Sequence, residues 1–234
     1  MSERRKLIVF SIVFWVAVNF ASLSMFSDEV SRWVRFIGTA FFFITATLHK
    51  PFSWKLFFIL LLFSICDFSL IYFENPIFNA LTFISRGAAF VIVGSIGAKK
   101  IKQLKINSLE LFIGAVLVAI NLVLLFELES MISLKHAEEL YSPGFYAFAF
   151  IAILTTIIAV SYSNRYSNLK SIFYMCAVLW MIFSDMTYFI GYYLDFPEFY
   201  YADHAFNILG SGFLMLYAAT TNKKENYIDI DVKI

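Results

Sequence analysis

Long apolar runs separated by short polar breaks fill almost the whole chain. A helix that crosses a bilayer takes about 20 apolar residues, and runs of that length follow one another to the end of the sequence. They lack the period-two alternation that the strands of a membrane barrel need. The pattern predicts an all-α polytopic membrane protein, one domain over 1–234 with eight helices near 7–26, 32–49, 54–73, 77–98, 107–127, 142–162, 169–194 and 200–220.

The composition agrees with a membrane protein. Hydrophobic residues make up 61% of the 234 residues and charged residues only 15%, far from the balance of soluble domains. The formal net charge is +1, and the basic residues are spread over several polar breaks instead of forming one patch. We therefore expect a lipid rather than a nucleic acid as the partner.

The basic residues also predict an orientation. They gather at 4–6, 50–55, 99–105, 165–170 and 223–233, while the alternate breaks are mainly acidic or neutral. The positive-inside rule then places both termini in the cytoplasm, with the first helix uncleaved in the inner or plasma membrane. Termini on one side require an even number of spans, in agreement with eight.

Two aspartates interrupt apolar runs in similar surroundings. Asp67 lies in "FSICDFSLIYFENP" and Asp185 in "FSDMTYFIGYYLDF". At 1.5 Å per residue, both are expected roughly 10–15 Å below the outer surface. A carboxylate there costs at least about 2.5–3.5 kcal/mol, so both should face the interior of the bundle.

The helices that carry these aspartates belong to two similar hairpins. Helices 54–73 and 77–98 are joined by a proline-containing break, as are helices 169–194 and 200–220. Four helices separate the two copies along the chain, so both would run in the same direction. This favours a parallel four-plus-four internal repeat.

Further polar residues recur at helical spacing near the aspartates. Because positions three or four apart share a helix face, they predict a polar cavity open toward the outer leaflet. Asp203 has a second interpretation, as a solvated acid favoured by the dipole at a helix start. Arg86 is expected to neutralise one aspartate or to contact a lipid phosphate. The candidate substrate-binding residues are Arg86, Asn79, Tyr188, Asp203 and Asn207.

Two carboxyl groups close together in a low-dielectric site suit acid–base chemistry. Both cannot ionise readily, so one keeps its proton and acts as acid while the other acts as base. A zinc site needs three or four ligands, and only His204 of the three histidines is predicted near the cavity. Asp67 and Asp185 are therefore the predicted catalytic residues of a hydrolase without a metal or another cofactor.

The stretches "FSICDFSLIYFENPIFNALTFISRGAAFVIVG" and "CAVLWMIFSDMTYFIGYYLDFPEFYYADHAFNILGSGFLMLY" resemble the YhhN or lysoplasmalogenase family of eight-span membrane proteins. The resemblance implies hydrolysis of the vinyl ether bond of a lysolipid, with the two intramembrane aspartates of the family at Asp67 and Asp185. Among the positions that differ, Cys66 stands where the family usually has glycine and Arg86 where the next helix usually carries histidine. The Lys50–Pro51 pair follows the second helix instead of opening it, and Asn207 is the residue closest to the usual glutamine of the final helix.

Two other classes of function share these features. Repeats, intramembrane charges and a polar cavity also describe transporters and lipid-binding membrane proteins without chemistry. A catalytically inactive relative, in which Arg86 permanently pairs an aspartate, is the third interpretation.

Overall fold

A computed structural model describes residues 3–48, 53–101, 126–132 and 142–220, with Phe112, Ala115, Val116, Ala119 and Val123 besides. Over these residues the regular structure is entirely helical. The predicted helix 107–127 lies mostly outside the described residues. The long helices are α1 (Glu3–Met25), α2 (Asp28–Leu48), α3 (Trp54–Ile71), α4 (Pro76–Ile101), α6 (Ser142–Tyr166), α7 (Leu169–Tyr193) and α8 (Phe199–Ala219).

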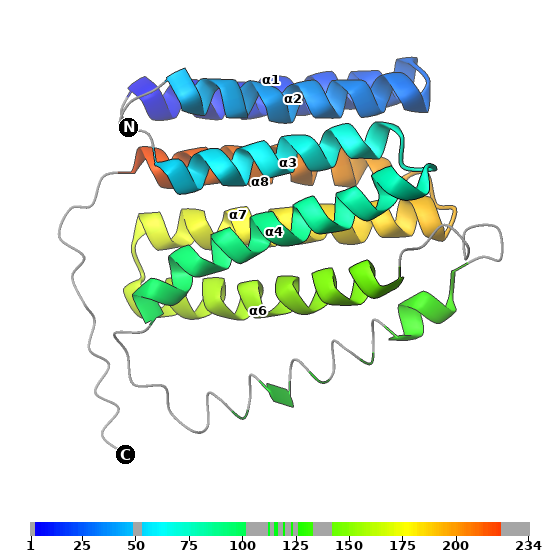
Figure 1. Ribbon diagram of the computed structural model, residues 1–234. Coiled ribbons are helices and arrows are strands. Elements are labelled where there is room, and N and C mark those ends of the chain that lie inside the picture. The colour runs from blue at the N-terminus through cyan, green and yellow to red at the C-terminus, as the bar shows by residue number, and fades with distance from the viewer. Residues whose placement is uncertain are drawn as a thin grey trace.

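The helices lie roughly side by side in successive layers (Figure 1). Helices α1 and α2 form one outer side, α3 and α8 follow, then α4 and α7, and α6 closes the other side. Each of the hairpins α3–α4 and α7–α8 packs its two members against each other. This arrangement places α3, α7 and α8 in the middle, where the predicted polar residues lie.

Five described helices are long and apolar enough to cross a membrane: α1, α3, α4 up to Lys100, α6 and α7. Helices α2 and α8 have 21 residues each but carry more polar side chains, among them Arg35 and Asp203. These side chains point inward, as described below. The prediction of a helical membrane protein is thus confirmed in its coarse form.

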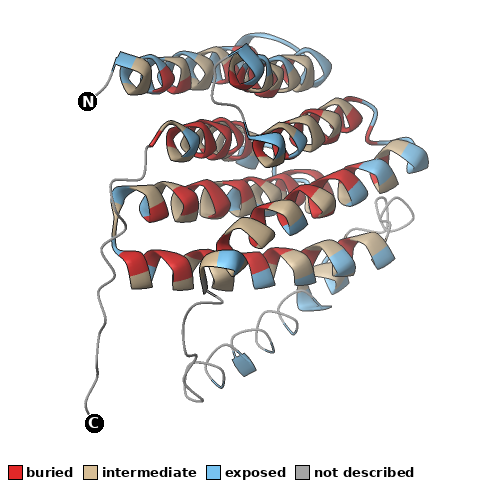
Figure 2. Cartoon of the chain, turned by 60° about the vertical axis from the view of Figure 1, so that its left-hand side comes forward, coloured by how far each residue is buried: buried red, intermediate tan, exposed pale blue. Residues whose placement is uncertain are grey.

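Burial along the helices fits a lipid environment on the outside (Figure 2). Large apolar side chains such as Phe10, Ile44 and Ile84 are exposed, at 67%, 53% and 60%. Polar residues occupy the interior instead, and Asn19 and Asn207 are fully buried. Because lipid solvates apolar groups and not polar ones, this distribution keeps the polar groups paired with one another.

Local sequence signals determine where two of the central helices begin. Pro76 is the first residue of α4, where its missing N–H costs nothing, and the Asn75 side chain accepts a hydrogen bond from the N–H of Ile77. Asn168 caps α7 by accepting a hydrogen bond from the N–H of Ser171, whose hydroxyl in turn accepts one from the backbone N–H of Asn168. The first of these signals sets where the α3–α4 hairpin turns, and the second sets where α7 begins after α6.

A close approach of α7 and α8 depends on Gly210. A Cβ there would lie 2.5 Å from Cγ of Met181 and 3.2 Å from its backbone nitrogen. The backbone atom cannot withdraw unless α7 moves. Small residues at such contacts let membrane helices pack closely, and here the contact holds α7 and α8 beside the polar interior.

We expect Gly210→Ala to destabilise the protein by about 1–3 kcal/mol, the usual cost of overpacking. Gly87→Ala is the matched control, because the nearest atom its Cβ would meet is Cδ1 of Ile151 at 3.7 Å. Thermal unfolding of both variants in detergent checks this. A melting temperature that falls equally in both, or in neither, would contradict the close α7–α8 contact.

Candidate functional site

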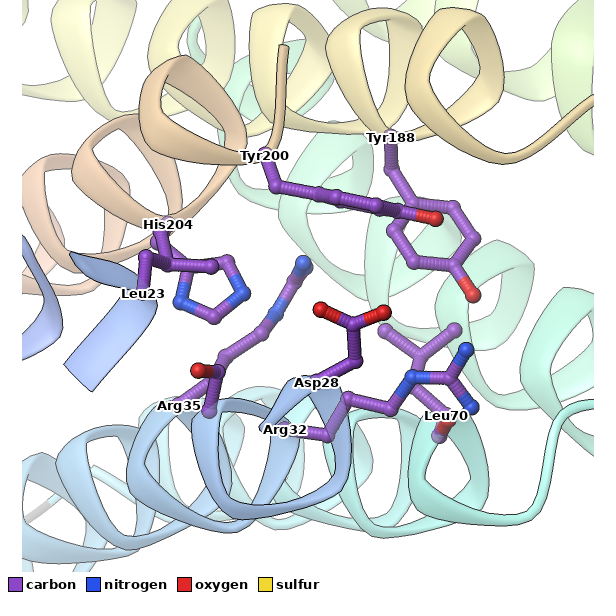
Figure 3. Close-up of a pocket in the computed structure, with 9 residues that line it drawn as sticks. Leu23, Asp28, Arg32, Arg35, Leu70, Tyr188, Tyr200 and His204 are labelled. Carbon is purple, nitrogen blue, oxygen red and sulfur yellow. Dashed lines mark hydrogen bonds between the residues drawn. The ribbon is translucent and has the colours of Figure 1, made fainter. Parts of the chain in front are cut away.

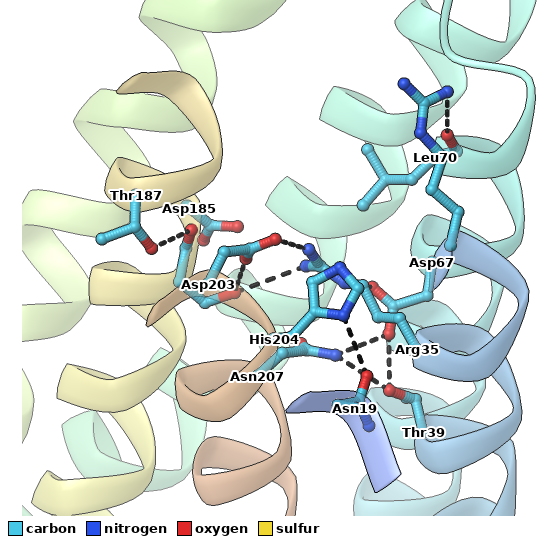
Figure 4. Close-up of polar contacts among 12 residues, drawn as sticks. Asn19, Arg35, Thr39, Asp67, Leu70, Asp185, Thr187, Asp203, His204 and Asn207 are labelled. Carbon is cyan, nitrogen blue, oxygen red and sulfur yellow. Dashed lines mark hydrogen bonds and ion pairs between the residues drawn. The ribbon is translucent and has the colours of Figure 1, made fainter. Parts of the chain in front are cut away.

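Asp67 lies fully buried on α3 and is surrounded by donors (Figure 4). Its carboxylate accepts hydrogen bonds from Nε of Arg35 at 3.2 Å and from Nδ2 of Asn207 at 2.8 Å. The Thr39 hydroxyl donates a third. Two of these donors are on α2 and one is on α8, so Asp67 joins three helices.

Arg35 on α2 forms two buried ion pairs, one with Asp67 and one with Asp203. The second oxygen of Asp203 accepts a hydrogen bond from the Ser184 hydroxyl at 2.6 Å. Nη2 of Arg35 also donates to that hydroxyl, at 3.3 Å. The guanidinium therefore connects α2 with α3, α7 and α8 in the interior.

Asp185 on α7 pairs with Arg86 on α4, with Nε 2.8 Å from Oδ1. The other guanidinium nitrogens of Arg86 donate to Oδ1 of Asn207 at 3.5 Å and to the carbonyl of Met181 at 3.3 Å. The guanidinium lies 4.7 Å from the ring centroid of Phe63. Arg86 thus neutralises Asp185 and not Asp67, which settles a choice that the sequence left open.

Asn207 on α8 joins the two parts of the network. Its amide nitrogen donates to Asp67 and also to the Thr39 hydroxyl at 3.0 Å, while its amide oxygen accepts from Arg86. Asp67 and Asp185, both selected from the sequence, are therefore connected through two side chains. Of the two, only Asp185 has an exposed side-chain part, at 20%, against 0% for Asp67.

Of the remaining predicted residues, Tyr188 contacts the network and Asn79 lies outside it. Tyr188 lies above Arg35, whose guanidinium carbon is 5.6 Å from the ring centroid. Asn79 is buried but donates to the Tyr193 hydroxyl at 3.2 Å, outside the network. Tyr193, the partner of Asn79, is only 1% exposed, because it packs among other aromatic rings near the α7–α8 connection.

The interpretation of Asp203 as a solvated acid at a helix start is wrong, and its neighbour His204 is buried as well. They are 0% and 3% exposed, because the first turns of α8 pack against α1, α2 and α7. Nδ1 of His204 lies 2.9 Å from the side-chain oxygen of Asn19 on α1. Asp203 thus belongs to the network as a partner of Arg35, and His204 ties α8 to α1.

Sequence reasoning missed Arg35 and Thr39 as site residues. The predicted helix begins near residue 32, whereas α2 already begins at Asp28, so Arg35 lies about two turns inside the helix. One signal was present, since Arg35 and Thr39 are four residues apart and share a face of an otherwise apolar run.

A recess opens at the end of the bundle where α1 meets α2 and α7 meets α8 (Figure 3). Its volume is about 10 Å³, room for about one water molecule. The polar cavity predicted from the sequence is therefore narrow here, because the polar groups below it pack against each other. The recess is lined by Leu23, Asp28, Ser31, Arg32, Arg35, Leu70, Tyr188, Tyr200 and His204.

This arrangement offers carboxyl groups, guanidinium groups and hydroxyls for proton transfer and charge stabilisation. Within the described part of the chain, no three His, Cys, Asp or Glu side chains are grouped as metal ligands. The chemistry that these residues can perform by themselves is acid–base chemistry.

Replacing Arg35 with methionine should destabilise the protein by about 3–5 kcal/mol, because Asp67 and Asp203 lose their buried cation. Arg32→Met is the matched control on the same helix. Arg32 pairs at 2.7 Å with Glu74, whose side chain is 55% exposed, and donates to the carbonyls of Leu70 and Ile71 at 3.3 and 3.4 Å, so a smaller loss of about 1–2 kcal/mol is expected. Thermal unfolding in one detergent compares the two. Equal losses would mean that the Arg35 pairs contribute no more than a surface pair.

No family model, no curated protein and no solved structure matches the chain. The function therefore has to be inferred from the residues of the site.

Proposed function

We propose that the protein is an integral membrane hydrolase of the lysoplasmalogenase type that cleaves the vinyl ether bond of a lysolipid. The observation that supports this most is the connection of Asp67 to Asp185 through Asn207 and Arg86. Two carboxyl groups in one low-dielectric network are what metal-free acid–base hydrolysis requires. The quoted stretches that resemble the YhhN family contain both aspartates.

Exposure distinguishes the roles of the two aspartates. Asp185 has the partly exposed carboxylate, so it is the group that a substrate meets first. Asp67 lies behind Asn207 and is held by three donors. In the proposed reaction Asp67 is the acid, reached when Asn207 moves aside, and Asp185 is the base that orients water.

The reaction begins with transfer of a proton from Asp67 to the vinyl carbon farther from the ether oxygen. The other vinyl carbon becomes part of an oxocarbenium ion, which the Asp185 carboxylate stabilises. Asp185 then takes a proton as the water oxygen bonds to that carbon, giving a hemiacetal. Asp185 then returns its proton to the ether oxygen while the hemiacetal hydroxyl gives its proton to the Asp67 carboxylate. The carbon–oxygen bond breaks, a fatty aldehyde and the glycerophospho headgroup are released, and both carboxyl groups regain their starting protonation states.

Arg86 is best placed to orient Asp185. All three of its guanidinium nitrogens already have protein partners, and its side chain is 2% exposed. A lipid phosphate would have to displace those partners. We therefore assign Arg86 to positioning in this reaction, in preference to phosphate binding.

The same contacts favour a second candidate, a lipid-binding or transporter-like membrane protein without chemistry. Asp67 is fully buried, and both oxygens of its carboxylate accept hydrogen bonds from neighbouring side chains. Arg86 and Asp185 would then form a structural ion pair. This alternative predicts loss of stability, and no loss of turnover, when the pair is broken.

For the membrane arrangement we propose eight spans with both termini in the cytoplasm and a parallel four-plus-four repeat. The two hairpins support the repeat, because α3 and α7 each carry an aspartate and each packs on the helix that follows. Helices α2 and α8 would complete the spans, since their polar side chains face inward instead of toward lipid.

Single cysteines at Lys99 and Glu198 test the orientation in a background without Cys66 and Cys176. The positive-inside rule predicts that Lys99→Cys reacts with a membrane-impermeant maleimide only after the cells are opened, whereas Glu198→Cys reacts in intact cells. The opposite labelling pattern would place the recess on the cytoplasmic side.

Purified protein given a lysoplasmalogen should release a fatty aldehyde. Asp67→Asn and Asp185→Asn keep the shape of the side chain but cannot exchange a proton, so each should lower turnover by about 10²-fold or more. Glu198→Gln is the control, because this exposed residue makes no side-chain cap contact at the start of α8.

An ester lysolipid, assayed for fatty-acid release, distinguishes ether from ester cleavage in the same preparations. Melting temperatures of all variants are measured in parallel. Lack of product from both lipids with a stable wild-type protein would rule out the hydrolase in favour of the second candidate.

A further inference from the structure

The buried charges of the network do not balance. Three carboxyl groups, those of Asp67, Asp185 and Asp203, face two guanidinium groups. The two arginines are each 2% exposed, and Asp67 and Asp203 are 0% exposed. If all five groups were ionised, the interior would carry one negative charge without a counterion, which a membrane interior strongly disfavours.

The imbalance lies around Arg35. Asp185 has Arg86 as its partner, whereas Asp67 and Asp203 share the single guanidinium of Arg35. Arg32, one turn away, contacts Glu74 at the bundle end instead. Two carboxylates that share one cation in a low-dielectric site resist ionising together.

A tyrosine whose ring lies near Arg35 has an unpartnered hydroxyl. Tyr188 is 9% exposed, and its hydroxyl has no hydrogen-bond partner within the described part of the chain. It lines the recess together with Arg35, whose guanidinium carbon is 5.6 Å from the centroid of the tyrosine ring (Figure 3). A single water molecule in the recess would connect this hydroxyl with solvent at the bundle end.

We propose that Asp67 and Asp203, the two partners of Arg35, together bind one proton, which is carried by one carboxyl group or the other. This cluster is then a buried proton-binding site, and the recess is its entrance. Each guanidinium then faces one carboxylate, and the interior is neutral. Ser184 and Thr39 are hydroxyls that can donate or accept as the proton moves. The ionisable groups that face the site or its recess are, besides Asp67 and Asp203, Asp28, Arg32 and Arg35 on α2, Cys66 on α3, Arg86 on α4, Asp185 and Tyr188 on α7, and Tyr200 and His204 on α8.

The proton-binding site is inferred from the number of buried charges and from their geometry. It does not depend on whether the protein hydrolyses a lipid. It deepens the proposed function, because the reaction requires a protonated Asp67 at its start. In the non-catalytic alternative the same proton would be the ion that the membrane protein exchanges with solvent.

Infrared spectroscopy of the full chain in nanodiscs, without any lysolipid, tests the site. The wild-type protein should show the C=O stretching band of a protonated carboxyl group, shifted by exchange into D₂O. Asp203→Asn leaves one carboxyl for each guanidinium and should abolish the band. Asp67→Asn gives the same balance and is the second variant if Asp203→Asn does not fold. Asp28→Asn, in the recess lining but outside the ion pairs, should keep the band.

Three results would overturn the proposal. One is a wild-type spectrum without the band, and another is a band unchanged in both Asp67→Asn and Asp203→Asn. The third is a melting temperature that rises with sodium concentration in the wild type and not in Asp203→Asn, because a metal cation would then supply the missing charge. Since none of these measurements uses lipid turnover, failure of the hydrolase and failure of the proton site are told apart.

Discussion

The buried guanidinium of Arg35 is the constraint on which the interior depends. A charge placed inside a membrane protein must be paired, and the partners of Arg35 come from α3 and α8, with a hydroxyl from α7. Their relative positions are therefore set by the fork geometry of one guanidinium. If a helix rotated about its axis by one residue, at least one carboxylate would lose its cation.

A second guanidinium organises the other half of the interior, and Asn207 makes the two halves one unit. Arg86 lies against the ring of Phe63 and holds Asp185, so aromatic packing and ion pairing fix the same side chain. Asn207 donates to Asp67 and accepts from Arg86, the partner of Asp185. A substitution at either aspartate therefore alters hydrogen bonds in the same chain of contacts, which includes both arginines. If some of its groups lacked hydrogen-bond partners, such a buried network would destabilise the fold. It therefore favours the one helix arrangement in which all of its groups are paired.

The dense pairing also explains why the site is narrow. Polar groups that satisfy one another leave little space, and the recess above Arg35 holds about one water molecule. A lipid would meet Asp185 first, because it is the one carboxylate of the three with an exposed part. Exchange of a proton needs much less room than entry of a lipid, so it is compatible with the recess as it stands.

The sequence alone determined that the protein is helical and suited to a membrane, because helix length and apolar content are local properties of the chain. It also singled out Asp67 and Asp185, since a carboxylate in an apolar run is costly wherever the run packs. Only the tertiary structure decided that Arg86 pairs with Asp185, that Arg35 serves Asp67 and Asp203, and that His204 is buried. Ion pairing depends on how helices distant in sequence are rotated and placed beside each other. Linear spacing states which residues share a face of one helix, but not which face of another helix it meets.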